Sequence, residues 1–418
     1  MRMTTDPCGC DAPGRAALTK VQALERLLAR VEPVGETETV AIADGLGRIL
    51  AEPVISAIDV PAWDNSAMDG YAIRHADLAS ADGRLRVAQR IPAGFAGTAL
   101  EPGTAARIFT GAPVPEGCDT VVIQEVCEAA EDWVRVPLDS KPGANIRRIG
   151  EDIRAGSEVV AAGTRLAPQH LGLAASVGAA RIHVRRRLRV AVFSSGDELV
   201  MPGDPLGPGQ IYNSNRFMLF GLLQRLGCET IDLGIVEDTL DATEQALRRG
   251  AAQADLIVGS GGVSVGEEDH IKTALERVGT LELWTIAIRP GKPLAFGRIG
   301  TTPFIGNPGN PVSLFVTFCL FGIPVIRRLQ GIAGDLRPPT LQVRAGFDWP
   351  RPDKRREFHR ARLRTAEDGS PELLVFPSRS SAVLSSVAWA DGLVEIPEGR
   401  VIQKGDLVDF IPFEGLLG

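Results

Sequence analysis

Three acidic side chains, Glu198, Asp238 and Asp269, each follow a stretch of sequence that is typical of a buried β-strand. The three expected strands are 189–194, 230–236 and 255–259. Ligands of open α/β sheets bind at the carboxyl ends of the strands, so we expect these carboxylates to gather at one edge of one sheet. Carboxylate oxygens suit a hard divalent cation, and the recurrence of acids at successive strand ends therefore favours a metal site.

A glycine-rich loop, Gly259-Ser260-Gly261-Gly262, follows the third of these strands, and three acids follow it at 267–269. Glycines lack the Cβ atoms that would keep backbone N–H groups away from an anion. The pattern favours a phosphate held by the loop and a cation held by the acids. The alternative is an ordinary strand-to-helix turn with an acidic helix start. The loop contains neither a G-x-G-x-x-G fingerprint nor a Walker A lysine, which argues against an ordinary dinucleotide or ATP site.

The composition is that of a folded protein, with 418 residues of which 44% are hydrophobic and 23% charged. The net charge of −7 argues against a nucleic-acid partner. The N-terminus has no apolar signal segment, and the longest apolar run, Val312 to Ile326, has 15 residues and indicates a buried helix rather than a membrane span. Scattered cysteines are typical of reduced thiols. We therefore expect a cytoplasmic protein with no membrane partner.

Local patterns change along the chain in an order that predicts several domains. A capping box from Thr19 to Gln22 opens a helix. Short runs of β-forming residues, broken by glycine and proline, extend from about Ala62 to Leu138 and return after Gln330. Between them, strands alternate with helices, as in a doubly wound α/β domain. The expected fold class is α/β plus β, with the doubly wound domain flanked by two small β domains and an N-terminal helical or linker domain.

Two polar stretches lie outside the expected α/β domain. The first, from Pro61 to Ala72, packs two acids, an amide and a hydroxyl among small residues, without a helical or strand period. This pattern alone favours a surface loop. The second, Asn145 to Asp152, mixes charged residues around a glycine.

Seven motifs, taken together and in order, resemble the molybdopterin molybdenumtransferases of the MoeA type, the family that includes the E domain of gephyrin. They are PAWDNSAMDGYA, TGAPVPEGCDTVV, NIRRIGEDI, SSGDEL, SGGVSVGEEDH, RPGKPLAFG and NPGNPVS. Each motif alone is weak, but the seven in sequence are specific, and the resemblance extends from Thr19 nearly to the C-terminus. The resemblance makes the α/β domain MogA-like. The predicted boundaries are a disordered tail at 1–17, a discontinuous linker domain at 18–61 plus 151–187, an inserted β domain at 62–150, the α/β domain at 188–336 and a C-terminal β-barrel domain at 337–418.

The resemblance implies the last assembly step of molybdenum cofactor. The enzyme would take adenylylated molybdopterin and molybdate, insert the metal into the dithiolene, and release AMP with the help of Mg²⁺. Family members are elongated homodimers, with the active cleft between the α/β domain of one subunit and the β domain of the other. The upstream adenylyltransferase and the molybdoenzyme acceptors are further candidate partners.

Roles are carried over residue by residue from the matching motifs. The resemblance implies catalytic roles for Asp69, Asp152, Glu198, Asp238 and Asp269, and it assigns Mg²⁺ to the last three. The implied substrate-binding residues are Thr110, Ser260, Gly261, Gly262, Arg289, Lys292, Ser313, Arg360 and Ser381. Molybdate is a tetrahedral dianion that needs cations and hydrogen-bond donors, and Arg289, Lys292, Ser313, Arg360 and Ser381 match the family positions for it.

The sequence departs from the family pattern at three places near the expected anion site. Arg289 stands where lysine is usual, and Asn307 replaces an apolar residue. Ser380 and Ala382 flank Ser381, where the family usually has Gly-Ser-Gly. If this loop requires a positive φ, Ala382 would be strained there.

Two other functions are compatible with parts of the pattern. The preceding step, adenylylation of molybdopterin by ATP, uses an enzyme that resembles the α/β domain alone, and the flanking β domains argue against it. The second alternative is a non-catalytic scaffold like gephyrin. The strand-end acids disfavour a loss of catalysis, although scaffolding could coexist with it.

Overall fold

The computed structural model describes residues 17–262, 270–291 and 293–417. These residues form two compact units, which we describe separately. The first unit consists of the described parts of Met1–Glu38, Gly47–Ile49 and Arg185–Gly418, and the second of Thr39–Leu46 and Leu50–Val184. Apart from Ala17, the predicted disordered tail lies outside the described residues.

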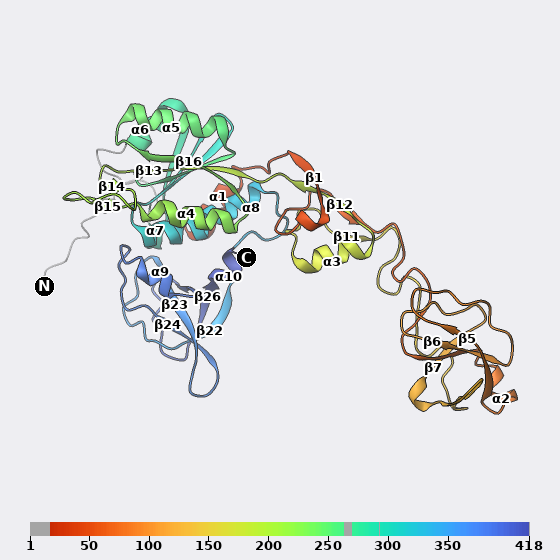
Figure 1. The fold of residues 1–418 in the computed structure, drawn as a ribbon. Coiled ribbons are helices and arrows are strands. Elements are labelled where there is room, and N and C mark those ends of the chain that lie inside the picture. Colours follow the sequence, from red (N-terminus) through yellow and green to blue (C-terminus); the bar gives the residue numbers. More distant parts are fainter. Residues whose placement is uncertain (1–16, 263–269, 292, 418) are drawn as a thin grey trace. The chain divides into compact units, whose positions relative to one another are not determined.

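A six-stranded sheet with the order β16-β13-β17-β21-β20-β18 is the centre of the first unit (Figure 1). The first four strands of this order run parallel, and β20 is antiparallel to both of its neighbours. The strands are β13 (Arg189–Ser195), β16 (Glu229–Val236), β17 (Leu256–Ser260), β18 (Thr280–Thr285), β20 (Pro293–Ile299) and β21 (Thr302–Asn307). A short strand, β19 (Ile288–Arg289), follows β18 along the chain.

Helices cover both faces of this sheet (Figure 1). Val192 and Val258 share a core with α4 (Ser214–Arg225), whereas Phe193 and Ile257 share a second core with two helices on the opposite face. Those two helices are α5 (Leu240–Gln253) and α6 (His270–Val278). Successive residues of a strand point to opposite faces, so one strand contributes to both cores. The doubly wound α/β architecture predicted from the sequence is confirmed.

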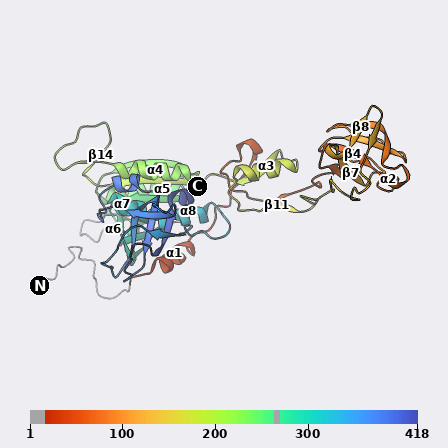
Figure 2. The ribbon, with the colours of Figure 1, turned by 90° about the horizontal axis from the view of Figure 1, so that it is seen from below.

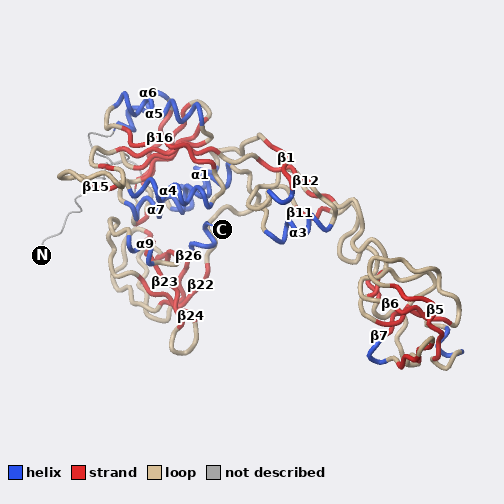
Figure 3. The backbone as a smooth tube through the Cα atoms, viewed as in Figure 1, coloured by secondary structure: helices blue, strands red, loops and turns tan. Residues whose placement is uncertain are grey.

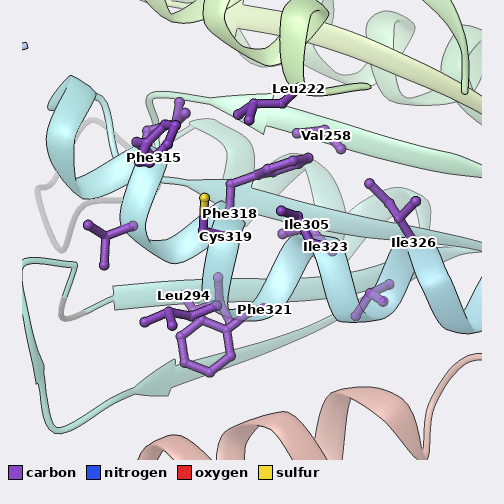
Figure 4. Packing of buried hydrophobic residues seen from close by; sticks show 14 of the residues in the cluster. Leu222, Val258, Leu294, Ile305, Phe315, Phe318, Cys319, Phe321, Ile323 and Ile326 are labelled. Atoms are coloured by element: carbon purple, nitrogen blue, oxygen red, sulfur yellow. The ribbon is translucent and has the colours of Figure 1, made fainter. Parts of the chain in front are cut away.

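The apolar run after β21 forms a continuous helix of the first core. It consists of α7 (Pro311–Thr317), a π-helical stretch (Phe318–Gly322) and α8 (Ile323–Leu329). Phe318 and Phe321 pack among side chains of the sheet (Figure 4). The run has the length and composition of a membrane span, but 89% of its most apolar window is buried inside the protein, as in a core helix.

The predicted helix of 15 residues, 312–326, was too short, because the helical run begins at Pro311 and ends at Leu329, with Pro324 inside it. Proline has no amide to donate to the preceding turn, and a wider helical register is a common local adjustment to such a defect. The π-helical stretch ends at Gly322, two residues before this proline.

Five strands close into a barrel in the C-terminal part of the first unit. β23 pairs with β24 on one side and with β25 on the other, and the ring continues through β22 and β26. Figure 3 shows β22, β23, β24 and β26 of this barrel as red strands. Leu373, Val394 and Phe410 belong to a separate barrel core. The barrel strands are β22 (Leu341–Ala345), β23 (Arg356–Thr365), β24 (Pro371–Val375), β25 (Gly392–Ile396) and β26 (Leu407–Pro412).

Shorter elements complete the first unit. The predicted capping box opens α1 (Lys20–Leu28), with Thr19 and Gln22 each accepting a hydrogen bond from the other's backbone N–H. β14 (Leu199–Val200) and β15 (Ile211–Tyr212) pair at the base of a loop that extends away from the sheet (Figure 2). The remaining helices are α9 (Ser385–Trp389) and α10 (Phe413–Leu417).

The second unit contains a six-stranded sheet with the order β7-β4-β6-β5-β9-β8. Its strands are β4 (Gly70–Ile73), β5 (Arg84–Ile91), β6 (Thr104–Ile108), β7 (Thr120–Ile123), β8 (Glu128–Ala130) and β9 (Trp133–Arg135). The prediction of a surface loop up to Ala72 was wrong at its end, because β4 is buried between β6 and β7. A Cβ at Gly70 would lie 2.0 Å from the Val122 carbonyl oxygen, so this crowded position requires glycine.

The second unit also contains short strands and helices outside this sheet. β3 (Asn65–Ser66) pairs with β10 (Ile146–Arg147), and thereby joins the two polar stretches noted in the sequence. The other elements are β1 (Thr37–Ala41), β2 (Val54–Ile55), α2 (Asp77–Ser80), β11 (Glu158–Val160), α3 (Pro168–Ser176) and β12 (Arg181–Arg185).

Candidate active site

A cleft of about 800 Å³ lies in the first unit at the carboxyl ends of β13 and β17. Ser195 and Ser260, the last residues of these two strands, both line it. The chain passes from β13 to β16 on one side and then to β17 on the other, so the strand order reverses between β13 and β17. Such a reversal point is where open α/β sheets bind ligands.

Two of the three predicted metal-binding acids, Glu198 and Asp238, line this cleft. The hydroxyl of Ser195 donates to Asp238 Oδ1 over 3.4 Å. The third acid, Asp269, lies outside the described residues. No group of three or more His, Cys, Asp or Glu side chains suited to a metal ion occurs in the part of the chain that the structure describes. Two carboxylates and a hydroxyl nevertheless form an all-oxygen donor set, which suits Mg²⁺ because this ion retains several waters.

The glycine loop is folded tightly against the end of β13. Gly261 and Gly262 have positive φ angles of 88° and 64°. A Cβ at Gly261 would lie 2.4 Å from the Ser195 carbonyl oxygen, so no other residue fits this position without a shift of the backbone. The amide of Gly261 donates to the Asn307 carbonyl oxygen over 3.1 Å and is therefore already engaged. The glycines thus serve close packing, and the predicted use of this amide for a phosphate finds no support in its geometry.

Two helix N-termini border the cleft. α4 begins after Asn213 and α7 after Asn310, and both asparagines line the cleft. The Asn213 side-chain oxygen caps α4 by accepting a hydrogen bond of 3.2 Å from the amide of Arg216. Helix N-termini carry partial positive charge, so two of them at the border of one cleft favour an anionic ligand.

Asn213 and Asn215 were not predicted as site residues. Asn215 Nδ2 donates to Ser260 Oγ over 3.0 Å and to the Gly309 carbonyl oxygen over 2.7 Å. Asn213 Nδ2 and Asn215 Oδ1 are buried without a hydrogen-bond partner among the described atoms. One signal was available in the sequence, because Asn213 is the first residue of a stretch, 213–226, whose pattern predicts a helix, and asparagine is a preferred N-cap residue.

Arg360, on β23, is fully buried at 0% exposure. Its Nε donates to Ser386 Oγ over 2.9 Å, and its Nη2 donates to the Ser378 carbonyl oxygen over 2.5 Å. Its Nη1 has no partner in the described part of the protein. Burial lowers the pKa of this guanidinium, because the charged form is desolvated. A buried cation whose hydrogen-bond partners in the described part of the protein are neutral oxygens is suited to receive an anion.

The loop around Ser381 joins the barrel to the cleft. The Ser381 carbonyl oxygen accepts a hydrogen bond of 3.0 Å from the amide of Val312 in α7. Ala382 lines the cleft, whereas Ser381 does not. None of residues 380–382 has a positive φ, so Ala382 fits this loop without backbone strain.

The other predicted anion-binding residues are differently placed. Ser313 lines the cleft near the start of α7. Arg289 instead forms an ion pair with Asp353, at 2.9 Å, and does not line the cleft. Lys292 lies outside the described residues. Asn307 is fully buried, and its side-chain amide donates to the Gly259 carbonyl oxygen over 3.3 Å, which accounts for a polar residue at this position.

The second unit holds the three remaining predicted site residues. Asp69 Oδ1 accepts hydrogen bonds from the Thr110 amide at 2.8 Å and from the Thr110 hydroxyl at 3.0 Å. These bonds hold the pKa of Asp69 below its usual range. Asp152 is exposed on a separate turn, where its amide donates to the Val60 carbonyl oxygen. The structure thus brings Asp69 and Thr110 together.

Three family models match the chain in order. The MoeA N-terminal region (domain I and II) matches residues 18–178, a probable molybdopterin binding domain matches residues 191–328, and the MoeA C-terminal region (domain IV) matches residues 342–413. The second match contains β13 except for its first two residues, all of β16 and β17, and the helices that line the cleft.

Similar proteins match over almost the whole chain. The "Molybdopterin molybdenumtransferase" of Haemophilus influenzae is 41% identical, over 96% of this chain and 100% of that protein. The protein of the same name from Nostoc is 38% identical, over 90% and 88% of the two chains. The crystal structure of a molybdopterin biosynthesis moeA protein from Pyrococcus horikoshii OT3 has a TM-score of 0.81 and 28% identity, and covers 94% of this chain and 99% of that one.

A molybdopterin-binding type of α/β domain between MoeA-type N- and C-terminal regions defines an enzyme of molybdenum cofactor biosynthesis. The chain belongs to the molybdopterin molybdenumtransferase family. The alternative of an adenylyltransferase, which would resemble the α/β domain alone, is not favoured, because both flanking regions of the family are present.

Proposed function

We propose that this protein inserts molybdate into adenylylated molybdopterin, with Mg²⁺-dependent release of AMP. The observation that carries the proposal is the cleft at the ends of β13 and β17. Two carboxylates, the hydroxyl of Ser260 and two helix N-termini border this one cavity. The combination suits a phosphoanhydride with a bound cation, because the helix N-termini favour the phosphates and the carboxylates favour the metal.

Glu198 and Asp238 would hold Mg²⁺ in this cleft, together with Asp269 as the family resemblance implies. When bound, Mg²⁺ neutralises negative charge on the phosphoanhydride as its P–O bond breaks. The two described acids are separated along the chain but follow neighbouring strands, β13 and β16. Replacing either with a neutral amide would remove a charge without changing the shape of the side chain.

Molybdate would bind where the barrel loop meets α7. The support is the unpartnered Nη1 of the buried Arg360 and the presence of Ser313 in the cleft lining. Charge-assisted donors of this kind are roughly twice as strong as neutral ones and suit a doubly charged oxyanion. The family resemblance implies that Ser381 and Lys292 also bind molybdate. Arg289 forms an ion pair with Asp353, and it would have to leave this partner in order to bind the oxyanion.

The family resemblance implies that three residues of the second unit also belong to the active site. Asp69, Thr110 and Asp152 would complete the site from the second subunit of a homodimer that buries more than ~2,000 Å², as obligate dimers do. A mixing experiment tests this arrangement. Equimolar Asp69→Asn and Asp238→Asn chains, each with strongly reduced activity alone, should regain activity after joint refolding, because mixed dimers contain one site with both acids intact. Inactivity of dimers shown to be mixed would contradict the shared site, as would a monomer in light scattering.

In the cell, this protein would work together with the enzymes that make its substrate and receive its product. The protein would act in the cytoplasm, take its substrate from the upstream adenylyltransferase, and deliver its product to molybdoenzyme acceptors. Binding of this protein to a purified adenylyltransferase, with serum albumin in its place as the control, tests the first of these contacts.

The decisive assay supplies the purified protein with adenylylated molybdopterin, molybdate and Mg²⁺ under anaerobic conditions. Release of AMP that requires molybdate supports the proposal. Consumption of ATP with unadenylylated molybdopterin would instead support the adenylyltransferase. If neither reaction occurs, the non-catalytic scaffold becomes the better account. Boiled protein and a reaction without Mg²⁺ are the controls.

A further inference from the structure

The amide of Asn215 joins two segments of the cleft wall that are far apart in the sequence. Its Nδ2 donates to Ser260 Oγ, at the end of β17, over 3.0 Å. The same nitrogen donates to the carbonyl oxygen of Gly309, in the turn before α7, over 2.7 Å. Asn215 lies in the first turn of α4, and all three residues line the cleft.

The chemistry of these partners fixes the orientation of the Asn215 amide. A backbone carbonyl can only accept a hydrogen bond, so the group that faces Gly309 must be the NH₂ of the amide. The second hydrogen of this NH₂ points to Ser260 Oγ, which must therefore act as an acceptor. The reversed amide would set two oxygens against each other at Gly309, and so the assignment is determined by the hydrogen bonds.

This orientation leaves the hydroxyl hydrogen of Ser260 available as a donor. The serine oxygen already accepts from Asn215, and in the part of the chain that the structure describes the Ser260 hydroxyl donates to no acceptor. Ser260 is 2% exposed and lines the cleft into which the N-termini of α4 and α7 open. A phosphate oxygen is an acceptor without hydrogens, and is therefore the complementary group for this hydroxyl.

We propose that Asn215 is a positioning residue, which fixes the Ser260 hydroxyl as a donor to a phosphate oxygen of adenylylated molybdopterin. Asn215 acts through Ser260 and does not itself touch the substrate. The inference rests on the proposed function, because it takes the phosphoanhydride of that substrate as the ligand of the cleft. It differs from a direct role, in which the unpartnered Asn215 Oδ1 would accept a hydrogen bond from the substrate.

A double-mutant cycle separates these roles. The affinity for adenylylated molybdopterin is measured by anaerobic calorimetry for wild type, Asn215→Ala, Ser260→Ala and the double variant. A hydrogen bond to a charged group corresponds to roughly a 10- to 100-fold change in affinity. We expect Ser260→Ala to weaken binding by about this factor, Asn215→Ala to weaken it nearly as much, and the double variant to be no weaker than Ser260→Ala. Losses that multiply would overturn the inference, because Asn215 would then bind the substrate itself.

A purely structural role is excluded by a matched control. Gln330 is a comparable buried amide outside the cleft, since its Nε2 donates to the Leu226 carbonyl oxygen over 2.7 Å and its Oε1 has no partner among the described residues. Gln330→Ala should lower the unfolding midpoint without changing the affinity. An unchanged affinity in Asn215→Ala, or an equal loss in Gln330→Ala, would overturn the inference.

A second variant covers the case in which Asn215→Ala does not fold. Asn215→Asp retains the shape of the side chain but has no hydrogens to donate at neutral pH, so the Ser260 hydroxyl would turn toward the new carboxylate. Its affinity should fall at least as far as that of Ser260→Ala, and a wild-type affinity would contradict the inference. Tight binding with the expected coupling but without AMP release would refute the proposed function alone. AMP release with multiplying losses would refute the inference alone.

Discussion

One oxygen of Asp69, Oδ1, accepts both hydrogen bonds that Thr110 can donate to it. The amide of Thr110 lies at 2.8 Å and its hydroxyl at 3.0 Å. The hydrogen bond from the Thr110 amide is the largest cause of the lowered pKa of Asp69. The hydrogen bond from the Thr110 hydroxyl lowers this pKa further. A carboxylate that is fixed in this way remains charged to lower pH than a free aspartate.

Replacing Thr110 with valine removes the hydrogen bond from the Thr110 hydroxyl to Asp69 and leaves the hydrogen bond from the backbone amide in place. The pKa of Asp69 should then rise, because one of the two donors that favour the charged form is lost. If catalysis needs the Asp69 carboxylate, activity is lost as the pH falls through its pKa, and the acid limb of the rate profile for AMP release should move to higher pH. Thr98→Val, at an exposed threonine of the same unit, should leave the profile unchanged. An unshifted acid limb in Thr110→Val would count against a catalytic Asp69.

Asp238→Asn should lower the rate of AMP release by about 10²-fold or more, which is the scale for loss of one electrostatic stabiliser of a transition state. The variant should also need more Mg²⁺ for half-maximal activity. Asp241→Asn is the control, because Asp241 is exposed in the first turn of α5 and does not line the cleft. Equal rates for the two variants would show that Asp238 does not act on the metal or the substrate.

Arg360→Gln should raise the molybdate concentration for half-maximal AMP release by about 10- to 100-fold, the equivalent of one lost charge-assisted hydrogen bond. Affinity for the adenylylated pterin should remain near the wild-type value, because the strand-end acids are unchanged. Arg362→Gln, at an exposed arginine two residues along β23, controls for loss of charge. A wild-type molybdate dependence in folded Arg360→Gln would place the anion elsewhere.

His359 should make the stability of the first unit sensitive to mild acid. Its ring is 3% exposed and lies 4.3 Å from the ring of Trp349, and burial lowers its pKa below the ordinary value of 6.5. As the pH falls below that value, the unfolded chain binds a proton that the folded chain does not, so stability is lost. The pKa of the neighbouring Glu357 lies below its ordinary value of 4.5. Burial raises this pKa, but hydrogen bonds from His359, Arg379 and Trp349 together lower it by more. Its contribution is therefore lost at lower pH than that of His359.

The measurement is the midpoint of urea unfolding between about pH 7 and pH 5. His359→Asn should be less stable than wild type at neutral pH but should lose less stability on acidification. His183→Asn, at an exposed histidine, should retain the wild-type slope. Parallel pH dependences for wild type and His359→Asn would show that His359 is not the titrating group.

The fold and the location of the cleft could be predicted because both depend on regular patterns. Parallel strands must end at one edge of the sheet, so acids that follow successive strands meet there, as Glu198 and Asp238 do. β4 was missed because Tyr71 and Ala72 are buried in different cores on its two faces, and a short strand of this kind shows no alternation of polar and apolar residues.

Other features of the site depend on tertiary contacts that no local pattern encodes. The sequence gives no sign that Arg360 would be fully buried with one nitrogen unpartnered, because an arginine on a strand is usually exposed. The bond from Asn215 to Ser260 joins residues 45 positions apart. The ion pair of Arg289 with Asp353 likewise depends on the pairing of β19 with β23.

The most direct test of the account is the ratio of pterin-bound molybdenum to released AMP in a single turnover. Adenylylated molybdopterin is mixed with excess protein, molybdate and Mg²⁺, and both products are quantified in the same sample. The account predicts one molybdenum bound for each AMP released, with little release when molybdate is omitted. AMP release that is independent of molybdate, or that leaves the pterin without molybdenum, would identify a hydrolase and contradict the account.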